Sequence, residues 1–245
     1  AIRDWLLPFK ADLEKRATKQ EWWELQQAQL AYQQFFEKPK IIYQDITSTN
    51  PFSLESGTYY AANTCYFIPS EDRALLALVN SRFAWFFFSA ITNIARGGFL
   101  RLRTEFVQQL PIPELKFTHK QLSKWSDSAT EVAKDRFDIE VAFCHRILAD
   151  LAPPDSQKLT NKLENFWTLD FAAFRAEIKK AFKTEIPVKD RDGWETYLAE
   201  KSAEVKKLTA EIEVAEREID TIVYKLFDLT PDEIKLLESS LEGQY

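Results

Sequence analysis

Methionine is absent from this 245-residue sequence, and cysteine, histidine and glycine are scarce, with two, two and five residues respectively. Two cysteines cannot form a disulfide framework or a four-ligand zinc site, and two histidines do not rescue the latter. We therefore expect a reducing, cytoplasmic setting. Because no methionine stands at position 1, we also expect that the sequence is an excised fragment of a longer protein.

Long apolar runs are missing as well. The longest, residues 83–91, is interrupted by Ser89 and is too short to cross a bilayer, and the N-terminus lacks a signal-peptide core. A hydrophobic content of 45% with 14% aromatic residues is enough for a sizeable core. The composition predicts a soluble globular protein of one or two domains, with no membrane partner.

The charge is unevenly distributed along the chain. The net charge is −6, yet residues 1–118 carry 13 basic and 12 acidic side chains, against 19 basic and 26 acidic in residues 119–245. Residues 73–104 contain five arginines and no acidic residue. A local excess of this kind favours contact with phosphates, although a solvated arginine surface is an equally simple explanation.

Three punctuated segments follow one another in the first half of the chain. In residues 36–47, β-branched and aromatic residues begin directly after Pro39, which favours a strand. Residues 57–61 and 63–68 are two short extended runs. In residues 99–103, apolar and basic residues alternate after two glycines, so we expect a strand with both of its arginines on one face.

In order and spelling, these segments resemble the TaqI-like C-terminal specificity domain of type II restriction-modification enzymes and adenine-specific DNA methyltransferases. The marks of the resemblance are residues 36–41, 63–66 and 96–98, followed by 110–113. Weaker similarity, from residues 13–16 with Trp22-Trp23 to residues 218–231, extends the resemblance over nearly the whole chain.

The resemblance implies sequence-specific recognition of double-stranded DNA, as the specificity fragment of a bifunctional restriction endonuclease and adenine methyltransferase. The partners it implies are the methyltransferase and nuclease domains of the same polypeptide. That parent enzyme would use S-adenosylmethionine and Mg²⁺. We expect this chain to bind neither, and the alternative is a coiled-coil protein-interaction module that does not read DNA.

Catalytic motifs are not evident in the sequence. None of the five glycines lies in a loop of the kind that cradles a cofactor, and the only Pro-Pro pair is followed by Asp155 instead of an aromatic residue. Residues 231–235 contain the letters of a nuclease metal site, but the two acidic positions are too close together. Thr230, Pro231 and Glu233 instead predict a capping box that opens a short helix.

Helical patterns dominate the remainder. Apolar spacing predicts helices over residues 3–36, 71–91, 120–151, 169–182 and 194–227. The last has a heptad repeat that predicts a hairpin with the helix ending near Leu151, although dimerisation through the same seam is the alternative. We therefore expect the α+β class, with a small mixed or antiparallel sheet and helices in residues 1–118 and a helical hairpin or coiled coil in residues 119–245.

Candidate DNA contacts follow from these expectations. Phosphate contacts are expected from the basic residues Lys38, Lys40 and Arg96. Contacts to base edges are expected from Arg101, Arg103, Gln44, Asn63 and Thr104. No catalytic or metal-binding residue is predicted.

Overall fold

A computed structural model covers the 245 residues and describes residues 1–26, 30–94, 97–154 and 158–242. The chain divides into two compact units. Unit 1 consists of Ala1–Asp45 and Pro51–Glu71, and unit 2 consists of Ile46–Asn50 and Asp72–Tyr245. Each unit is described separately. The predicted division after residue 118 stays a prediction.

Unit 1 contains a three-stranded antiparallel sheet. Its strands are β1 (Lys40–Gln44), β3 (Ser53–Glu55) and β4 (Cys65–Ile68), in the order β3-β1-β4. The predicted strands in residues 36–47 and 63–68 are thus confirmed. Residues 57–61 do not form the strand that we expected, and β3 pairs with β1 instead.

The N-terminal part of unit 1 differs from its prediction. The expected helix over residues 3–36 is divided into α1 (Ile2–Leu6), a 3₁₀ turn (Leu7–Phe9), α2 (Lys10–Leu13) and, later, α3 (Leu30–Phe36). Pro8 lies in the 3₁₀ turn. The Arg16 guanidinium then donates to the carbonyls of Leu13, Trp22 and Glu24, at 2.9, 3.0 and 2.9 Å, so the chain turns where apolar spacing alone predicted a continuous helix.

Unit 2 begins with a second small sheet and a pair of core helices. Strand β2 (Ile46–Thr47) pairs antiparallel with β5 (Leu100–Arg101). The single helix expected over residues 71–91 is two, α4 (Arg73–Val79) and α5 (Arg82–Ile91), which bend by 54°. Asp72 caps α4 and Ser81 caps α5. Most residues of α4 are buried, and α5 buries Ala84, Trp85 and Phe88.

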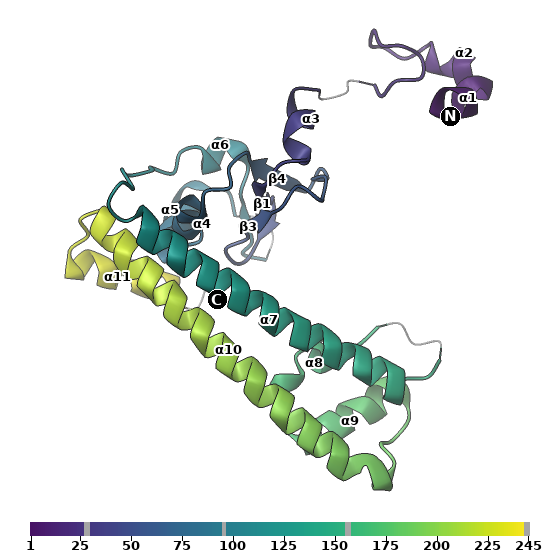
Figure 1. The fold of residues 1–245 in the computed structure, drawn as a ribbon, viewed down its shortest axis with the longest axis vertical. Coiled ribbons are helices and arrows are strands. Elements are labelled where there is room, and N and C mark those ends of the chain that lie inside the picture. Colours follow the sequence, from purple (N-terminus) through teal and green to yellow (C-terminus); the bar gives the residue numbers. More distant parts are fainter. Residues whose placement is uncertain (27–29, 95–96, 155–157, 243–245) are drawn as a thin grey trace. The chain divides into compact units, whose positions relative to one another are not determined.

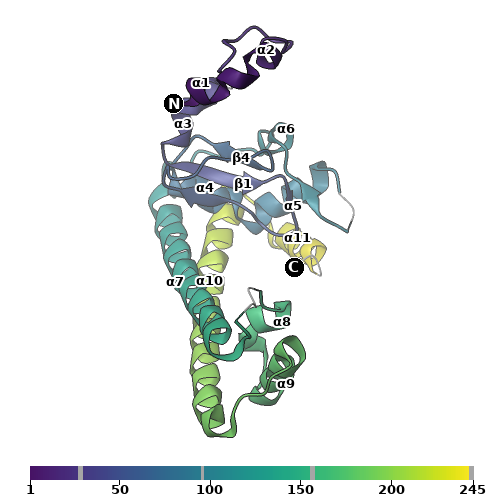
Figure 2. The same ribbon diagram turned by 90° about the vertical axis from the view of Figure 1, so that its right-hand side faces the viewer.

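Two long helices form the predicted hairpin within one chain. Helix α7 (His119–Leu151) packs against α10 (Arg191–Leu226), and the heptad residues Leu198, Val205 and Ile219 are buried. Figures 1 and 2 show the two helices side by side. The expected hairpin partner for the heptad helix is therefore α7.

Short helices close the two ends of the hairpin. The connection carries α8 (Asn161–Glu164), a 3₁₀ turn (Phe166–Thr168), α9 (Phe171–Phe182) and a second 3₁₀ turn (Val188–Asp190). An aromatic core forms there, in which Phe143 stacks on Phe166 with 3.8 Å between ring centroids. After α10 comes α11 (Pro231–Leu241), which begins with the predicted capping box of Thr230 and Glu233.

The expected α+β class is confirmed: small antiparallel sheets with helices are followed by a long helical region. Among the described residues, no single helix is long and apolar enough to cross a membrane, and only α4 and α5 taken together meet the length and composition for a bent span.

Candidate nucleic-acid interface

The predicted DNA contacts fall in both units. Lys38, Lys40, Gln44 and Asn63 belong to unit 1, whereas Arg101, Arg103 and Thr104 belong to unit 2. Arg96 lies outside the described residues. The structure therefore brings the candidates together only within each unit.

Lys40 does not have the surface position that a phosphate contact needs. Its side chain is 0% exposed, and its ammonium forms an ion pair with Glu55 on the neighbouring strand β3. The same ammonium donates to the carbonyls of Phe36, at 2.8 Å, and Lys38, at 3.4 Å. The Lys40 ammonium is therefore buried and bonded to three acceptors of the protein itself, so the predicted phosphate contact of Lys40 is wrong. Its physical role is to neutralise a buried carboxylate.

The Glu55 carboxylate, whose charge is balanced by Lys40, also holds the backbone that follows β3. Its oxygens accept hydrogen bonds from the backbone amides of Gly57, Thr58 and Tyr59, at 2.9, 2.6 and 3.1 Å. Burial alone raises the pKa of this carboxyl. The hydrogen bonds from Lys40 and the three amides outweigh burial and lower the pKa to about 2.

Three other candidates in unit 1 are exposed. Lys38 precedes β1, and Gln44 ends this strand opposite Cys65 of β4. Asn63 lies two residues before Cys65, and the Asp45 amide donates to the Thr64 carbonyl at 3.0 Å. Gln44 and Asn63 therefore belong to the same end of the sheet, where both side chains can reach solvent.

In unit 2, the basic segment after the glycine pair is only partly the strand that we expected. Strand β5 ends at Arg101, and Arg103 is the N-cap residue of α6 (Thr104–Val107), so a single strand does not carry both arginines. The alternation of burial is nevertheless present. Leu100 and Leu102 are buried, Arg101 is half-buried and Arg103 is exposed. Thr104 is exposed at the first position of α6.

A tight loop leads into this segment. Ile94 forms an antiparallel bridge with Leu100, and the Arg101 amide donates to the Asn93 carbonyl at 3.2 Å. Gly97 and Gly98 have φ angles of 91° and 84°, a region that glycine adopts readily. Both glycines therefore have a backbone conformation that other residues rarely adopt.

The arginine excess of residues 73–104 is reduced by acids from elsewhere in the chain. Arg73 pairs with Asp127 of α7 at 3.2 Å, and Arg82 pairs with Glu238 of α11 at 2.5 Å. Arg103 lies 3.8 Å from the Glu105 carboxylate, but both side chains remain about half exposed. A count of charges along the sequence could not reveal these pairs, because two of the acids come from distant helices.

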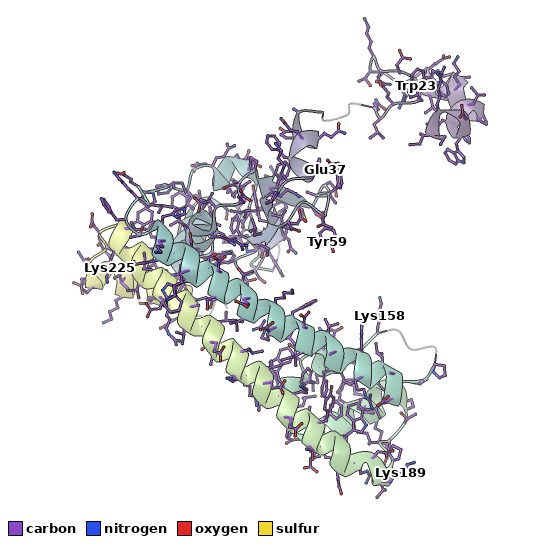
Figure 3. The ribbon with its side chains drawn as sticks, in the orientation of Figure 1. Trp23, Glu37, Tyr59, Lys158, Lys189 and Lys225 are labelled. Atoms are coloured by element: carbon purple, nitrogen blue, oxygen red, sulfur yellow. The ribbon has the colours of Figure 1, made fainter. Side chains whose placement is uncertain are left out.

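Aromatic residues at the surface of unit 1 were not among the predicted contacts. Tyr59 is 71% exposed and Tyr60 is 62% exposed, in the stretch that the sequence assigned to a strand. Figure 3 shows Tyr59 and Glu37 in unit 1. The turn-forming residues Ser56, Gly57 and Asn63 are the sequence signal that could have marked this stretch as a loop.

In the part of the chain that the structure describes, no group of three or more His, Cys, Asp or Glu side chains is arranged to hold a metal ion. The candidate interface is thus made of hydrogen-bonding and basic side chains.

Comparison with known proteins gives two family matches. Residues 4–112 match the TaqI-like C-terminal specificity domain, and residues 116–223 match a domain of unknown function, DUF8810. These two segments meet close to the beginning of α7.

Two curated proteins are similar to part of the chain. The type II methyltransferase M.XhoI of Xanthomonas vasicola is 33% identical over 101 residues, which cover 40% of this chain and 18% of that protein. The type II methyltransferase M.PaeR7I of Pseudomonas aeruginosa is 27% identical over 112 residues, which cover 44% of this chain and 18% of that protein. The matched segment therefore spans less than a fifth of either relative.

Proposed function

We propose that this chain reads DNA sequence for a type II restriction-modification system, because residues 4–112 match the TaqI-like C-terminal specificity domain. Both similar proteins are named type II methyltransferases. Following the family resemblance, the proposed reaction is the methylation of adenine within a chosen site. In this proposal the chain selects the site, while methyltransferase and nuclease domains of the same polypeptide modify and cleave DNA in the cytoplasm.

The proposal places S-adenosylmethionine and Mg²⁺ in those catalytic domains. The glycines of this chain do not form the loop that such a methyl donor needs, and its Pro-Pro pair lacks the aromatic residue used with a flipped adenine. The residues of this chain would contribute binding and orientation of the duplex.

The family match carries the proposal, and the exposed candidates are chemically suited to it. Lys38 can contact phosphates, which positions a protein on the duplex without reading its sequence. Arg103 can pair bidentately with guanine in the major groove, and Asn63 can pair in the same way with adenine.

The competing function, recruitment of a second subunit through the heptad seam, has less support. Leu198, Val205 and Ile219 are buried along the pairing of α10 with α7 in the same chain. A seam that is filled in this way has little apolar surface left for another copy.

Selection from a library of random-sequence duplexes tests the proposal. The wild-type chain should enrich one short sequence. Changing Arg103→Ala should then cost about 1–3 kcal/mol of binding on that sequence, and little on scrambled DNA, if Arg103 reads a base. If Arg103 contacts phosphate instead, affinity should fall on all sequences alike and the salt slope should decrease by about 0.9.

Arg217→Ala is the matched control, since Arg217 is 67% exposed on α10, outside the specificity segment. It should leave the enriched sequence and its affinity unchanged. Failure of the wild-type chain to enrich any sequence would contradict the proposed function.

A further inference from the structure

The stretch between β3 and β4, residues 56–64, is a polar, uncharged surface loop. It contains no charged side chain, and its side chains are mainly hydroxyl, amide and phenol groups. All of its residues except Gly57 and Ala61 are exposed. We call this stretch the tyrosine loop. A loop of this composition can donate and accept hydrogen bonds, and it carries no carboxylate that would repel phosphates.

The entrance of the tyrosine loop is fixed from inside the protein. The buried Glu55 carboxylate holds three successive amides, those of residues 57, 58 and 59, and the buried Lys40 ammonium balances its charge. A carboxylate is rarely buried without such compensation. These hydrogen bonds therefore fix the backbone from Gly57 to Tyr59, since the Tyr59 amide is itself the third donor to Glu55.

The middle and the exit of the tyrosine loop are also held. The Tyr60 ring stacks on Phe36 at 4.8 Å between centroids, and its hydroxyl donates to Glu37 at 3.2 Å. At the exit, the Cys65 amide donates to the Ala62 carbonyl at 3.0 Å. With both ends and Tyr60 fixed, the loop presents Tyr59 to solvent in one place.

We propose that the tyrosine loop reads bases in duplex DNA, with Tyr59 packing against a base and Asn63 donating to and accepting from a base edge. The inference rests on the proposed function and assigns part of its specificity to one loop. Tyrosine gives a large contact area while losing little side-chain entropy. A loop that is already ordered loses less entropy on binding, which leaves more of its contact energy for discrimination. Packing against another protein domain is the alternative use of the same loop.

Binding by the full chain tests the inference once library selection has given its preferred duplex. Tyr59→Ala should weaken binding to that duplex by about 5- to 150-fold, the range typical of one lost base contact, and change binding to scrambled DNA little. Asn63→Ala should relax the preference at one base pair. Trp5→Ala is the matched control, because Trp5 is 72% exposed in the same unit but lies outside the loop. It should change neither quantity.

The outcomes distinguish failure of base reading by the tyrosine loop from failure of the proposed function itself. If the wild-type chain selects a sequence and neither loop variant changes its affinity or preference, the tyrosine loop does not read bases. Equal weakening on scrambled and selected DNA by Tyr59→Ala would also overturn base reading. If the wild-type chain selects no sequence, the proposed function itself fails. Thermal melting should be the same for Tyr59→Ala and the wild type, since the ring is mostly in solvent.

Discussion

Glu55 of unit 1 and Asp220 of unit 2 are equally buried, with 7% of each residue exposed, yet their pKa values move in opposite directions. Burial raises the pKa of Glu55, but Lys40 and three amides lower it to about 2. Burial also raises the pKa of Asp220, and the hydrogen bond that the Arg82 amide donates to it, at 2.8 Å, does not outweigh burial. Nearby Glu238 raises it further, so that the pKa of Asp220 is about 7.

The Glu55 site shows that hydrogen-bond donors and a counter-charge can keep a buried carboxyl ionised against the effect of burial. The Glu55 pairing stabilises the fold fully above its ordinary pKa of 4.5, and this contribution is lost as the pH falls toward 2. Asp220 takes up a proton more readily in the folded state than in the unfolded state. Its contribution is greatest below its ordinary pKa of 3.8 and decreases as the pH rises to about 7.

Removing the counter-charge of Glu55 should have the largest effect. In Lys40→Met, the Glu55 carboxylate stays buried beside three amides without its cation, which should lower the free energy of unfolding by about 3–5 kcal/mol at pH 7. Urea denaturation of the full chain measures the change. Lys38→Met, an exposed neighbour, is the control and should remain within about 0.5 kcal/mol of the wild type. Equal stability of the two variants would show that the Lys40 pair is unimportant.

Removing the charge of Asp220 should have the opposite sign. Asp220→Asn keeps an oxygen that can accept from the Arg82 amide but avoids burying a carboxylate near Glu216 and Glu238. We expect a gain in unfolding free energy on the order of 2 kcal/mol at pH 8, and almost none at pH 4.

Denaturation of this variant at both pH values provides the measurement. Glu195→Gln, on the exposed face of the same helix, is the control. Destabilisation of Asp220→Asn at pH 8 would mean that the ionised carboxylate is favourable where it lies.

The smallest effect is spectroscopic. Because Glu55 accepts from the amides of residues 57–59, the chemical shifts of these three amides should titrate together, with a midpoint near pH 2. Nuclear magnetic resonance of the full chain follows them as the pH is lowered. In Glu55→Gln the titration should be absent. A midpoint near the ordinary value of 4.5 would show that the pKa of Glu55 is not lowered, and the contrast with Asp220 would be lost.

Periodic and local signals predicted the helical half well. The heptad spacing of Leu198, Val205 and Ile219 identified α10, and the order Thr230, Pro231, Glu233 identified the start of α11. These features depend on residues only a few positions apart, so the sequence contains all the information that they need.

Long-range pairing explains most of the errors. The sequence gives no sign that Lys40 would meet Glu55 fifteen residues later, so a buried lysine was assigned to phosphates. Likewise, Arg82 appeared to lie in an acid-free segment, although Glu238 of the last helix pairs with it. Residues 57–61 have tyrosines of high β propensity, which favours the strand that we expected, but the hydrogen bonds from the amides of residues 57–59 to Glu55 override this preference.

If the tyrosine loop reads bases as we propose, Gly57 limits how the specificity of this protein could be redesigned. Its φ is +98°, and a Cβ atom there would lie 2.6 Å from the carbonyl oxygen of Glu37, so no other residue fits without moving the backbone. Most of the following residues, 58–64, expose their side chains. A retargeting library should therefore hold Lys40, Glu55 and Gly57 constant and randomise the exposed positions after them, where new side chains can change the target sequence at little cost to folding.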